Sequence, residues 1–225
     1  MNTRGRLAVL AGCVLVALAV AWYAGSQHPP SSATPAPGSV RLGPEAGEDV
    51  AAYLARLPAT LPPDRARAPA LVQFAAETTA QDALAAVDGT TLVTAVFRVP
   101  LPRVQTALRF VALEPGVPAA TALDSARVRA QRAAAAEALQ TGRPGAVAAV
   151  EAASLDRADC RCVVALVVEG DRAGLGAVAG RAAVRAVEAA PSGTTDGELA
   201  LAPLLPEQTV RADPPPDDGP VPAAP

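Results

Sequence analysis

Residues 162–187, CVVALVVEGDRAGLGAVAGRAAVRAV, decide the fold predicted for this chain. The first seven residues are apolar without interruption, which predicts a strand. Asp171 is a typical helix N-cap, and Gly180 is a typical helix end. The β-branched residues of 184–187 then predict a second strand. The stretch therefore predicts a strand–helix–strand unit.

A similar pattern precedes it at an offset of 91 residues, where Leu84 matches Leu175 and Gly89 matches Gly180. The earlier unit comprises a strand, a helix and a strand at residues 71–75, 79–87 and 92–99. Neither unit can bury its sheet face alone, so the two should pair in one sheet, with both leucines pointing inward. We therefore expect an α+β fold, a ferredoxin-like sandwich of two βαβ units with both helices on one face.

The segment between the units is long enough to hold further elements. β-Formers at 104–113 predict an extra strand, and residues 119–158 predict an inserted helical hairpin, with helices at 119–140 and 145–158. Upstream, apolar residues spaced as on one helix face predict a short docked helix at 48–57. Residues 199–205 are expected either to add one strand or to staple the chain to the domain. These elements together define an α+β domain at 48–205.

The N-terminal region predicts a membrane anchor. Leu7–Gly25 contains 19 residues without a charge, and such a helix would span ~28 Å, close to the hydrocarbon thickness of a bilayer. Because Arg4 and Arg6 precede it, the positive-inside rule places residues 1–6 in the cytoplasm and the C-terminal domain outside. We therefore expect a single-pass protein of the cell membrane, held in the cytoplasmic membrane by a transmembrane helix at residues 7–25.

Two alternatives to an uncleaved anchor remain open. Leu10–Cys13 matches the lipobox pattern of bacterial lipoproteins, which would make Cys13 a lipidation site. Ala19–Ala21 resembles a signal-peptide cleavage site. All three interpretations place the domain outside the cytoplasmic membrane. Two low-complexity segments flank it: a Pro/Ser/Ala-rich tether at 26–47 and an acidic, Pro-rich tail at 206–225, which we expect to be disordered.

Composition and motifs limit the classes of function that the sequence allows. The net charge is −3 and aromatic residues are only 3% of the chain, which argues against nucleic-acid binding. The single histidine, His28, lies in the tether, and neither a P-loop nor a G-x-S-x-G motif is present. No catalytic, metal or cofactor-binding residue is predicted, so we do not expect an enzyme.

Two classes of function remain. The first is a membrane-tethered extracytoplasmic interaction or sensing module that acts through a neighbouring membrane or envelope protein. The alternative is an exported small-molecule-binding protein or enzyme with a site between the helical insertion and the sheet. An exposed apolar patch would favour the first class, and a pocket lined by the few aromatic residues would favour the second.

Cys160 and Cys162 are the only cysteines outside the anchor. On an extended strand they share a face with Val164, Leu166 and Val168, which favours buried thiols. An oxidising compartment favours a disulfide, within the chain or between chains, although same-face Cα atoms ~6.5–7 Å apart lie at the outer limit of disulfide geometry. Half of a metal site is the third possibility. A disulfide would make this pair a candidate for a redox or structural role.

The run from Cys162 to Asp171, followed by the strand Val184–Val187, resembles the extracytoplasmic modules of uncharacterised single-pass membrane-anchored proteins of high-GC actinobacteria. It is also similar to the last βαβ portion of ferredoxin-like modules in some sigma-factor regulators and protease propeptides. We expect neither of these activities, because only about six residues precede the anchor and no protease is expected after the domain.

Overall fold

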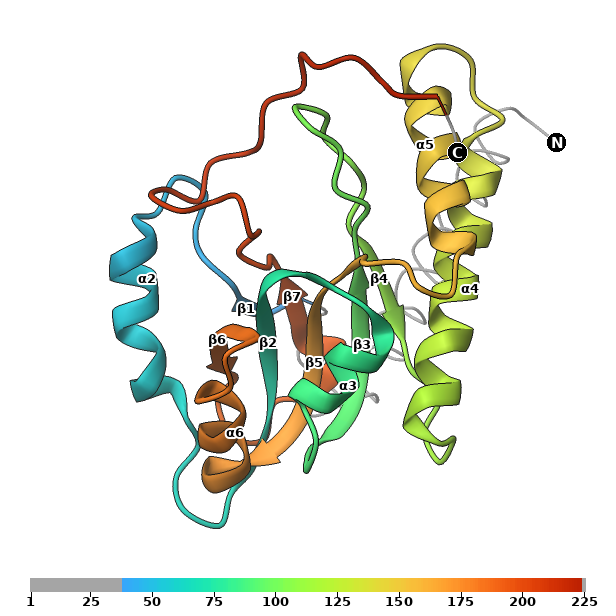
Figure 1. The fold of residues 1–225 in the computed structure, drawn as a ribbon. Coiled ribbons are helices and arrows are strands. Elements are labelled where there is room, and N and C mark those ends of the chain that lie inside the picture. The colour runs from blue at the N-terminus through green and yellow to red at the C-terminus, as the bar shows by residue number, and fades with distance from the viewer. Residues whose placement is uncertain (1–37, 224–225) are drawn as a thin grey trace, which may run out of the picture. The chain divides into compact units, whose positions relative to one another are not determined.

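Two strand–helix–strand units form the centre of the computed structural model, which describes residues 38–223 (Figure 1). The first unit contains β2 (Arg67–Thr78), α3 (Ala80–Ala86) and β3 (Thr91–Phe97), and the second contains β5 (Val163–Asp171), α6 (Arg172–Ala179) and β6 (Val184–Ala189). Thr79 and Asp171 cap the two helices, since their side chains accept hydrogen bonds from the N–H groups of Asp82 and Gly174 at 3.2 and 2.8 Å. Both predicted units and both predicted N-caps are confirmed.

The strands of the two units alternate in one antiparallel sheet with the order β4-β3-β5-β2-β6. Val72 of β2 lies opposite Leu166 of β5 on one side and opposite Val187 of β6 on the other. The extra strand expected between the units is β4 (Arg109–Ala112), which pairs with the edge of β3. Each unit supplies neighbours for the strands of the other, and the mixed α+β class is confirmed.

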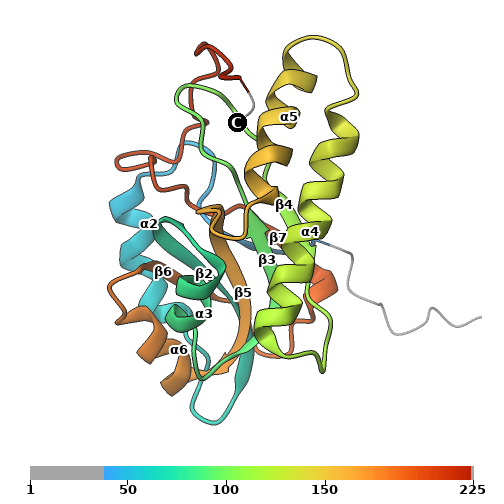
Figure 2. The same ribbon diagram turned by 45° about the vertical axis from the view of Figure 1, so that its right-hand side comes forward.

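The two faces of the sheet are covered differently (Figures 1 and 2). Helices α3, α6 and α4 (Ala119–Glu137) pack on one face, over a core that includes Phe74 and Phe97. A parallel pair of short strands, β1 (Val40–Leu42) and β7 (Leu199–Leu201), packs on the other face. The main sheet is therefore the middle layer of three.

β1 corrects the prediction of a tether at residues 26–47. Leu42 is 2% exposed, and its carbonyl accepts a hydrogen bond from the Ala202 N–H at 2.8 Å. The tether prediction was wrong for this part of the segment because it relied on Pro, Gly and Ser content. Two apolar residues, Val40 and Leu42, are enough to place three residues beside β7 and against the sheet.

Helix α2 (Val50–Arg56) docks on the domain through Val50 and Tyr53, as predicted, and continues into a 3-10 helix at Leu57–Thr60. The Tyr53 hydroxyl donates to Glu188 of β6 at 2.9 Å and accepts from the Gln73 amide of β2 at 2.7 Å. Burial raises the pKa of Tyr53 well above its ordinary value, so the hydroxyl stays a neutral donor. Polar contacts thus fix α2 to the sheet.

The predicted helical hairpin is present as α4 and α5 (Arg143–Asp156). Every fourth residue on one side of α4 is a buried alanine, at positions Ala122, Ala126, Ala130 and Ala134. Small side chains allow neighbouring elements to approach closely. The turn is equally tight, since a Cβ atom on Gly145 would lie 1.8 Å from the carbonyl oxygen of Gln140. The alanine bias of this segment therefore serves packing.

The predicted equivalence of Leu84 and Leu175 is wrong. Leu175 on α6 is fully buried, whereas Leu84 on α3 is only partly buried. The inward positions of α3 are Ala83, Ala86 and Val87. Since α4 also packs against α3, smaller side chains suffice on this side of the core.

The C-terminal tail was predicted to be disordered, but its described residues, 206–223, make defined contacts with the domain. Ala212 is buried and its N–H donates to the Glu48 carbonyl at 2.9 Å. Further along, the Gly219 N–H donates to the Arg103 carbonyl at 2.7 Å. Composition alone suggested disorder, because the arginines that hold the acidic residues lie 115 and 74 positions earlier in the chain.

Several predictions lie outside the described residues. They are the cytoplasmic residues 1–6, the anchor at 7–25 with the alternative lipidation of Cys13, and residues 26–37 of the tether. Between residues 38 and 223, no helix combines the length and the apolar character that crossing a bilayer requires.

Candidate functional site

The two cysteines singled out in the sequence form a disulfide between Cys160 and Cys162, with their Cα atoms 5.4 Å apart. The interpretation as buried free thiols is therefore wrong. Its premise was a continuous strand, but β5 begins only at Val163, and the Cys160 N–H closes a turn on the Arg157 carbonyl at 3.2 Å. Leaving the extended conformation brings the two Cα atoms within disulfide distance.

The predicted common face also fails at Val164. Cys162 packs in the helix-covered core with Leu166, whereas Val164 and Ala165 both pack on the opposite face. The cause is an irregularity in the β3–β5 pairing, where Phe97 lies opposite Val163 but Val96 lies opposite Ala165. Such a bulge reverses the faces of the residues on one side of it.

The disulfide lies where α5 returns to the sheet. Cys162 is 1% exposed and its carbonyl accepts from the Arg98 N–H at 2.8 Å, whereas Cys160 is only partly buried. An attacking thiolate would reach Cys160 and would have to expel the thiolate of Cys162 into an apolar core, where the charge is disfavoured. This arrangement favours a structural disulfide over a redox-active one. Within residues 38–223, no group of three or more His, Cys, Asp or Glu side chains has the arrangement of a metal site.

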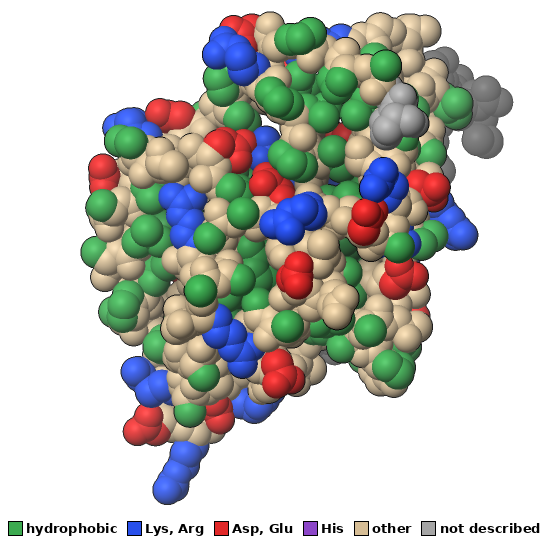
Figure 3. Space-filling view, viewed as in Figure 1, with side chains coloured by type: hydrophobic (Ala, Val, Ile, Leu, Met, Phe, Trp, Pro, Cys, Tyr) green, Lys and Arg blue, Asp and Glu red, His purple; other side chains and the backbone are tan. Residues whose placement is uncertain are grey.

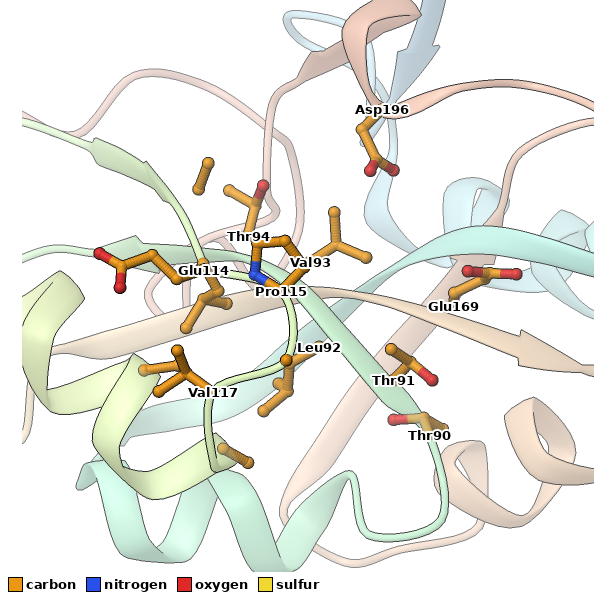
Figure 4. Close-up of a pocket in the computed structure, with 15 residues that line it drawn as sticks. Thr90, Thr91, Leu92, Val93, Thr94, Glu114, Pro115, Val117, Glu169 and Asp196 are labelled. Carbon is orange, nitrogen blue, oxygen red and sulfur yellow. The ribbon is translucent and has the colours of Figure 1, made fainter.

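A different part of the molecule forms a cavity of about 540 Å³ between β3 and the start of α4 (Figure 4). We call it the β3 cleft. Its walls come from the first half of β3, the segment between β4 and α4, and two carboxylates from other elements: Thr90, Thr91, Leu92, Val93, Thr94, Ala112, Leu113, Glu114, Pro115, Gly116, Val117, Ala119, Ala122, Glu169 and Asp196. The cleft thus joins the sheet, the helical insertion and the chain after β6.

The backbone edge of β3 is open inside this cleft. β4 pairs only with Thr94–Phe97, and one more hydrogen bond joins the Leu113 N–H to the Val93 carbonyl at 2.8 Å. Two residues later, Pro115 has no N–H group and cannot continue the ladder. Thr91 and Leu92 therefore extend beyond the end of β4, while β5 pairs with them on the other side.

Acidic side chains surround the open edge. Glu114 is paired with Arg129 at 2.8 Å, and Glu169 with Arg67 at 3.1 Å. Asp196 has no ion-pair partner within residues 38–223. Asp196 is exposed, and its partial desolvation together with the nearby charge of Glu169 raises the pKa of its carboxyl. In Figure 4, Asp196 and Glu169 lie at one end of the cleft, and Glu114 lies at the other.

The aromatic residues between positions 38 and 223 are not part of the cleft. Phe74 and Phe97 belong to the core, Tyr53 belongs to the polar contacts of α2, and Phe110 is 45% exposed on β4. Acidic and basic side chains are interspersed on the face seen in Figure 3. Nothing in the sequence singled out Glu169 or Asp196, although Pro115 after the predicted strand at 104–113 was a signal that pairing ends there.

Comparison with known proteins gave no match to this chain among family models, curated proteins or solved structures.

Proposed function

We propose that this chain is a membrane-tethered extracytoplasmic interaction module that binds an extended segment of a partner protein by strand addition to β3. The observation that carries the proposal is the open edge at Thr91 and Leu92 inside a cavity of about 540 Å³. Strand addition uses backbone hydrogen bonds for affinity and side-chain pockets for specificity.

The walls of the β3 cleft suit such a segment. Leu92, Leu113 and Val117 offer apolar surface for alternate side chains of an added strand. Natural sheets protect open edges or use them for pairing. This edge is short, so it favours a short partner segment over a long flat strand.

The acidic side chains of the β3 cleft favour a partner segment with basic residues. Asp196 is the carboxylate of the cleft without an ion-pair partner among the described residues, and partial desolvation and the charge of Glu169 raise its pKa. A cationic side chain of the partner would stabilise the ionised form of Asp196. We therefore assign the partner segment alternating apolar and basic residues, with one Lys or Arg facing Asp196.

The rest of the proposal rests on other features. The charge-free stretch at 7–25, preceded by Arg4 and Arg6, supports a cytoplasmic N-terminus, a membrane anchor and an extracytoplasmic domain. The strand order β3-β5-β2-β6, with α3 and α6 on one face, supports assignment of the central four strands to a ferredoxin-like fold with β4 added at the edge. An alkaline phosphatase fused after Pro225 should be active, and an inactive fusion with an active cytoplasmic reporter would reverse this topology.

The binding proposal is tested with the peptide Ac-RVRVRV-NH2 and the full chain in detergent micelles, by isothermal titration calorimetry. We expect saturable binding, no binding of Ac-EVEVEV-NH2, and strong weakening when alternate backbone nitrogens of the basic peptide are methylated. Equal binding of the methylated peptide would refute strand addition. Binding of arginine amide alone with the same affinity would instead indicate a small-molecule site.

Asp196→Asn provides the residue-level test, with the exposed Asp88→Asn outside the cleft as its control. The Asp196→Asn change should weaken binding of the basic peptide about three- to tenfold, as loss of one charge-assisted contact does. Because the folded state raises the pKa of Asp196, its protonated form stabilises the fold, and that contribution is lost as the pH rises through the folded pKa. The change should therefore weaken binding without lowering stability at pH 7. A variant that loses both together would indicate a structural role.

A further inference from the structure

Residues 206–219, which we call the C-terminal strap, cross from the region of α2 to the start of α5 (Figure 1). The first half of the strap follows the buried Leu204 and Leu205 and is anchored by Ala212. The second half contains Asp213-Pro-Pro-Pro-Asp217-Asp218-Gly219, which has no large apolar side chain except its prolines. The two halves are therefore held by different forces.

The second half is held by a small set of polar groups from two places. The Arg143 guanidinium binds the Asp217 carboxylate at 2.8 Å and the Gly219 carbonyl at 2.9 Å. The Gln105 N–H donates to Asp217 at 3.1 Å, and the Gln105 amide donates to the Pro215 carbonyl at 2.7 Å. Arg103 forms an ion pair with Asp218. Contacts with these arginines lower the pKa of both aspartates, so both are ionised at neutral pH.

Gly219 fits this surface closely. It is buried, and its N–H donates to the Arg103 carbonyl at 2.7 Å. A Cβ atom at this position would lie 2.6 Å from the Pro102 carbonyl oxygen and 2.8 Å from Arg103. Displacing the backbone atoms of Pro102 and Arg103 would strain the fold. The surface therefore accepts glycine at this position and excludes larger residues. Two carboxylates followed by glycine are thus recognised by shape as well as by charge.

These contacts nevertheless bind the second half of the strap only weakly. The side chains of Arg103 and Asp218 are each 61% exposed, and those of Arg143 and Asp217 are 40% and 46% exposed. Exposed ion pairs of this kind contribute little and are screened by salt. The strap also bridges two cavities of about 380 and 300 Å³ instead of packing continuously on the domain. It can therefore leave this surface while the core stays folded.

We infer that Arg103, Gln105 and Arg143 form a binding site for an acidic peptide segment of a partner protein, with the sequence character Pro-Asp-Asp-Gly, and that the strap occupies this site as a tethered competitor. The inference is independent of the β3 cleft, which lies on other elements. A partner segment gains access by displacing residues 213–219. The chain's own strap identifies the chemistry that the site recognises.

The competition can be estimated. A segment tethered by a short linker has an effective concentration on the order of 1 mM. For a peptide with the strap's own sequence, the apparent dissociation constant is the intrinsic value plus this effective concentration. A peptide with an intrinsic constant of about 0.3 mM should therefore bind the wild-type chain about fourfold more weakly than a chain whose strap is released.

The test uses the full chain in detergent micelles and the fluorescent peptide DPPPDDGP, measured by fluorescence anisotropy. The double variant Asp217→Asn/Asp218→Asn should release its own strap and bind the peptide several-fold more tightly than the wild type, with an affinity that falls as NaCl is raised. The control peptides DPPPDDAP and NPPPNNGP should bind at least tenfold more weakly. Adding Arg103→Gln and Arg143→Gln to the double variant should abolish binding.

Hydrogen exchange at the Gln105 amide reports release directly, because its N–H donates to Asp217 in the closed strap. Continued protection in the double variant would overturn the claim that the aspartates hold the strap. If the strap is released but the peptide does not bind, the proposed binding site is refuted. Equal binding of the glycine and alanine peptides would refute it as well. A wild-type dimer that disappears in the double variant would make a second copy of the chain the occupant and would equally overturn the inference.

Discussion

Replacing Leu175 by Ala should destabilise the domain much more than the same change at Leu84. Leu175 is fully buried between α6 and the sheet, and a Cβ atom on Gly170 would lie 3.0 Å from its side chain. The space around it is therefore closely filled. Leu84 lies at the matching position of the first unit but is only partly buried.

The expected magnitudes follow from these surroundings. Removing three carbon groups from a buried site costs about 2.4 kcal/mol at ~0.8 kcal/mol each. The strands around Leu175 cannot collapse into the vacated space, so a cavity term should raise the loss to about 3–4 kcal/mol. At Leu84 solvent replaces part of the side chain, and the loss should be about 1 kcal/mol.

The assay is urea unfolding of the two variants and the wild type in the same detergent, followed by far-ultraviolet circular dichroism. Unchanged m-values would show that stability, not compactness, has changed. A single transition in each case is expected, because the strands of the two units alternate in one sheet. Equal losses at Leu84 and Leu175, or a larger loss at Leu84, would refute the assignment of inward positions.

Three further predictions concern other parts of the fold. Tyr53→Phe should cost about 1–3 kcal/mol, because the buried amide of Gln73 loses its acceptor, and a neutral result in the same urea assay would contradict the proposed contacts. Gly145→Ala should destabilise the α4–α5 turn, whereas Gly176→Ala, with open space on α6, should stabilise by up to ~1 kcal/mol; the melting temperatures of the two variants should move in opposite directions. Alkylation of the denatured chain, read by mass spectrometry, should leave Cys160 and Cys162 unmodified until a reductant is added, and modification without reductant would disprove the disulfide.

Local signals explain why the two units could be predicted. Each helix has its own N-cap, Thr79 or Asp171, and each strand contains valine among other apolar residues. Such features act over a few residues and need no knowledge of the partner strands. The repeat at an offset of 91 residues then implied that the strands of the two units share one sheet.

Side-chain facing was less predictable, because it depends on the neighbouring strand. Val164 and Cys162 were expected on one face, yet the irregular pairing between β5 and β3 places them on opposite faces. Leu84 is less buried than its counterpart because α4, an element absent from the second unit, helps to fill the core beside α3. Neither a bulge nor an added helix layer changes the hydrophobic periodicity of the strand that it affects, so neither can be predicted from that strand's sequence.

The sequence by itself determined the βαβ units, their caps, the extra strand, the helical hairpin and the expectation of an N-terminal anchor. Only the tertiary structure decided where the candidate sites lie. The β3 cleft requires Asp196 to lie beside Glu169 and β4 to end before Thr91. The second half of the strap contacts the domain because Arg103 and Arg143 meet Asp218 and Asp217 across more than seventy residues of chain. Whether a charged side chain or an open strand edge can form a site depends on the residues that surround it in space. Those neighbours come from distant parts of the chain and cannot be read from its composition.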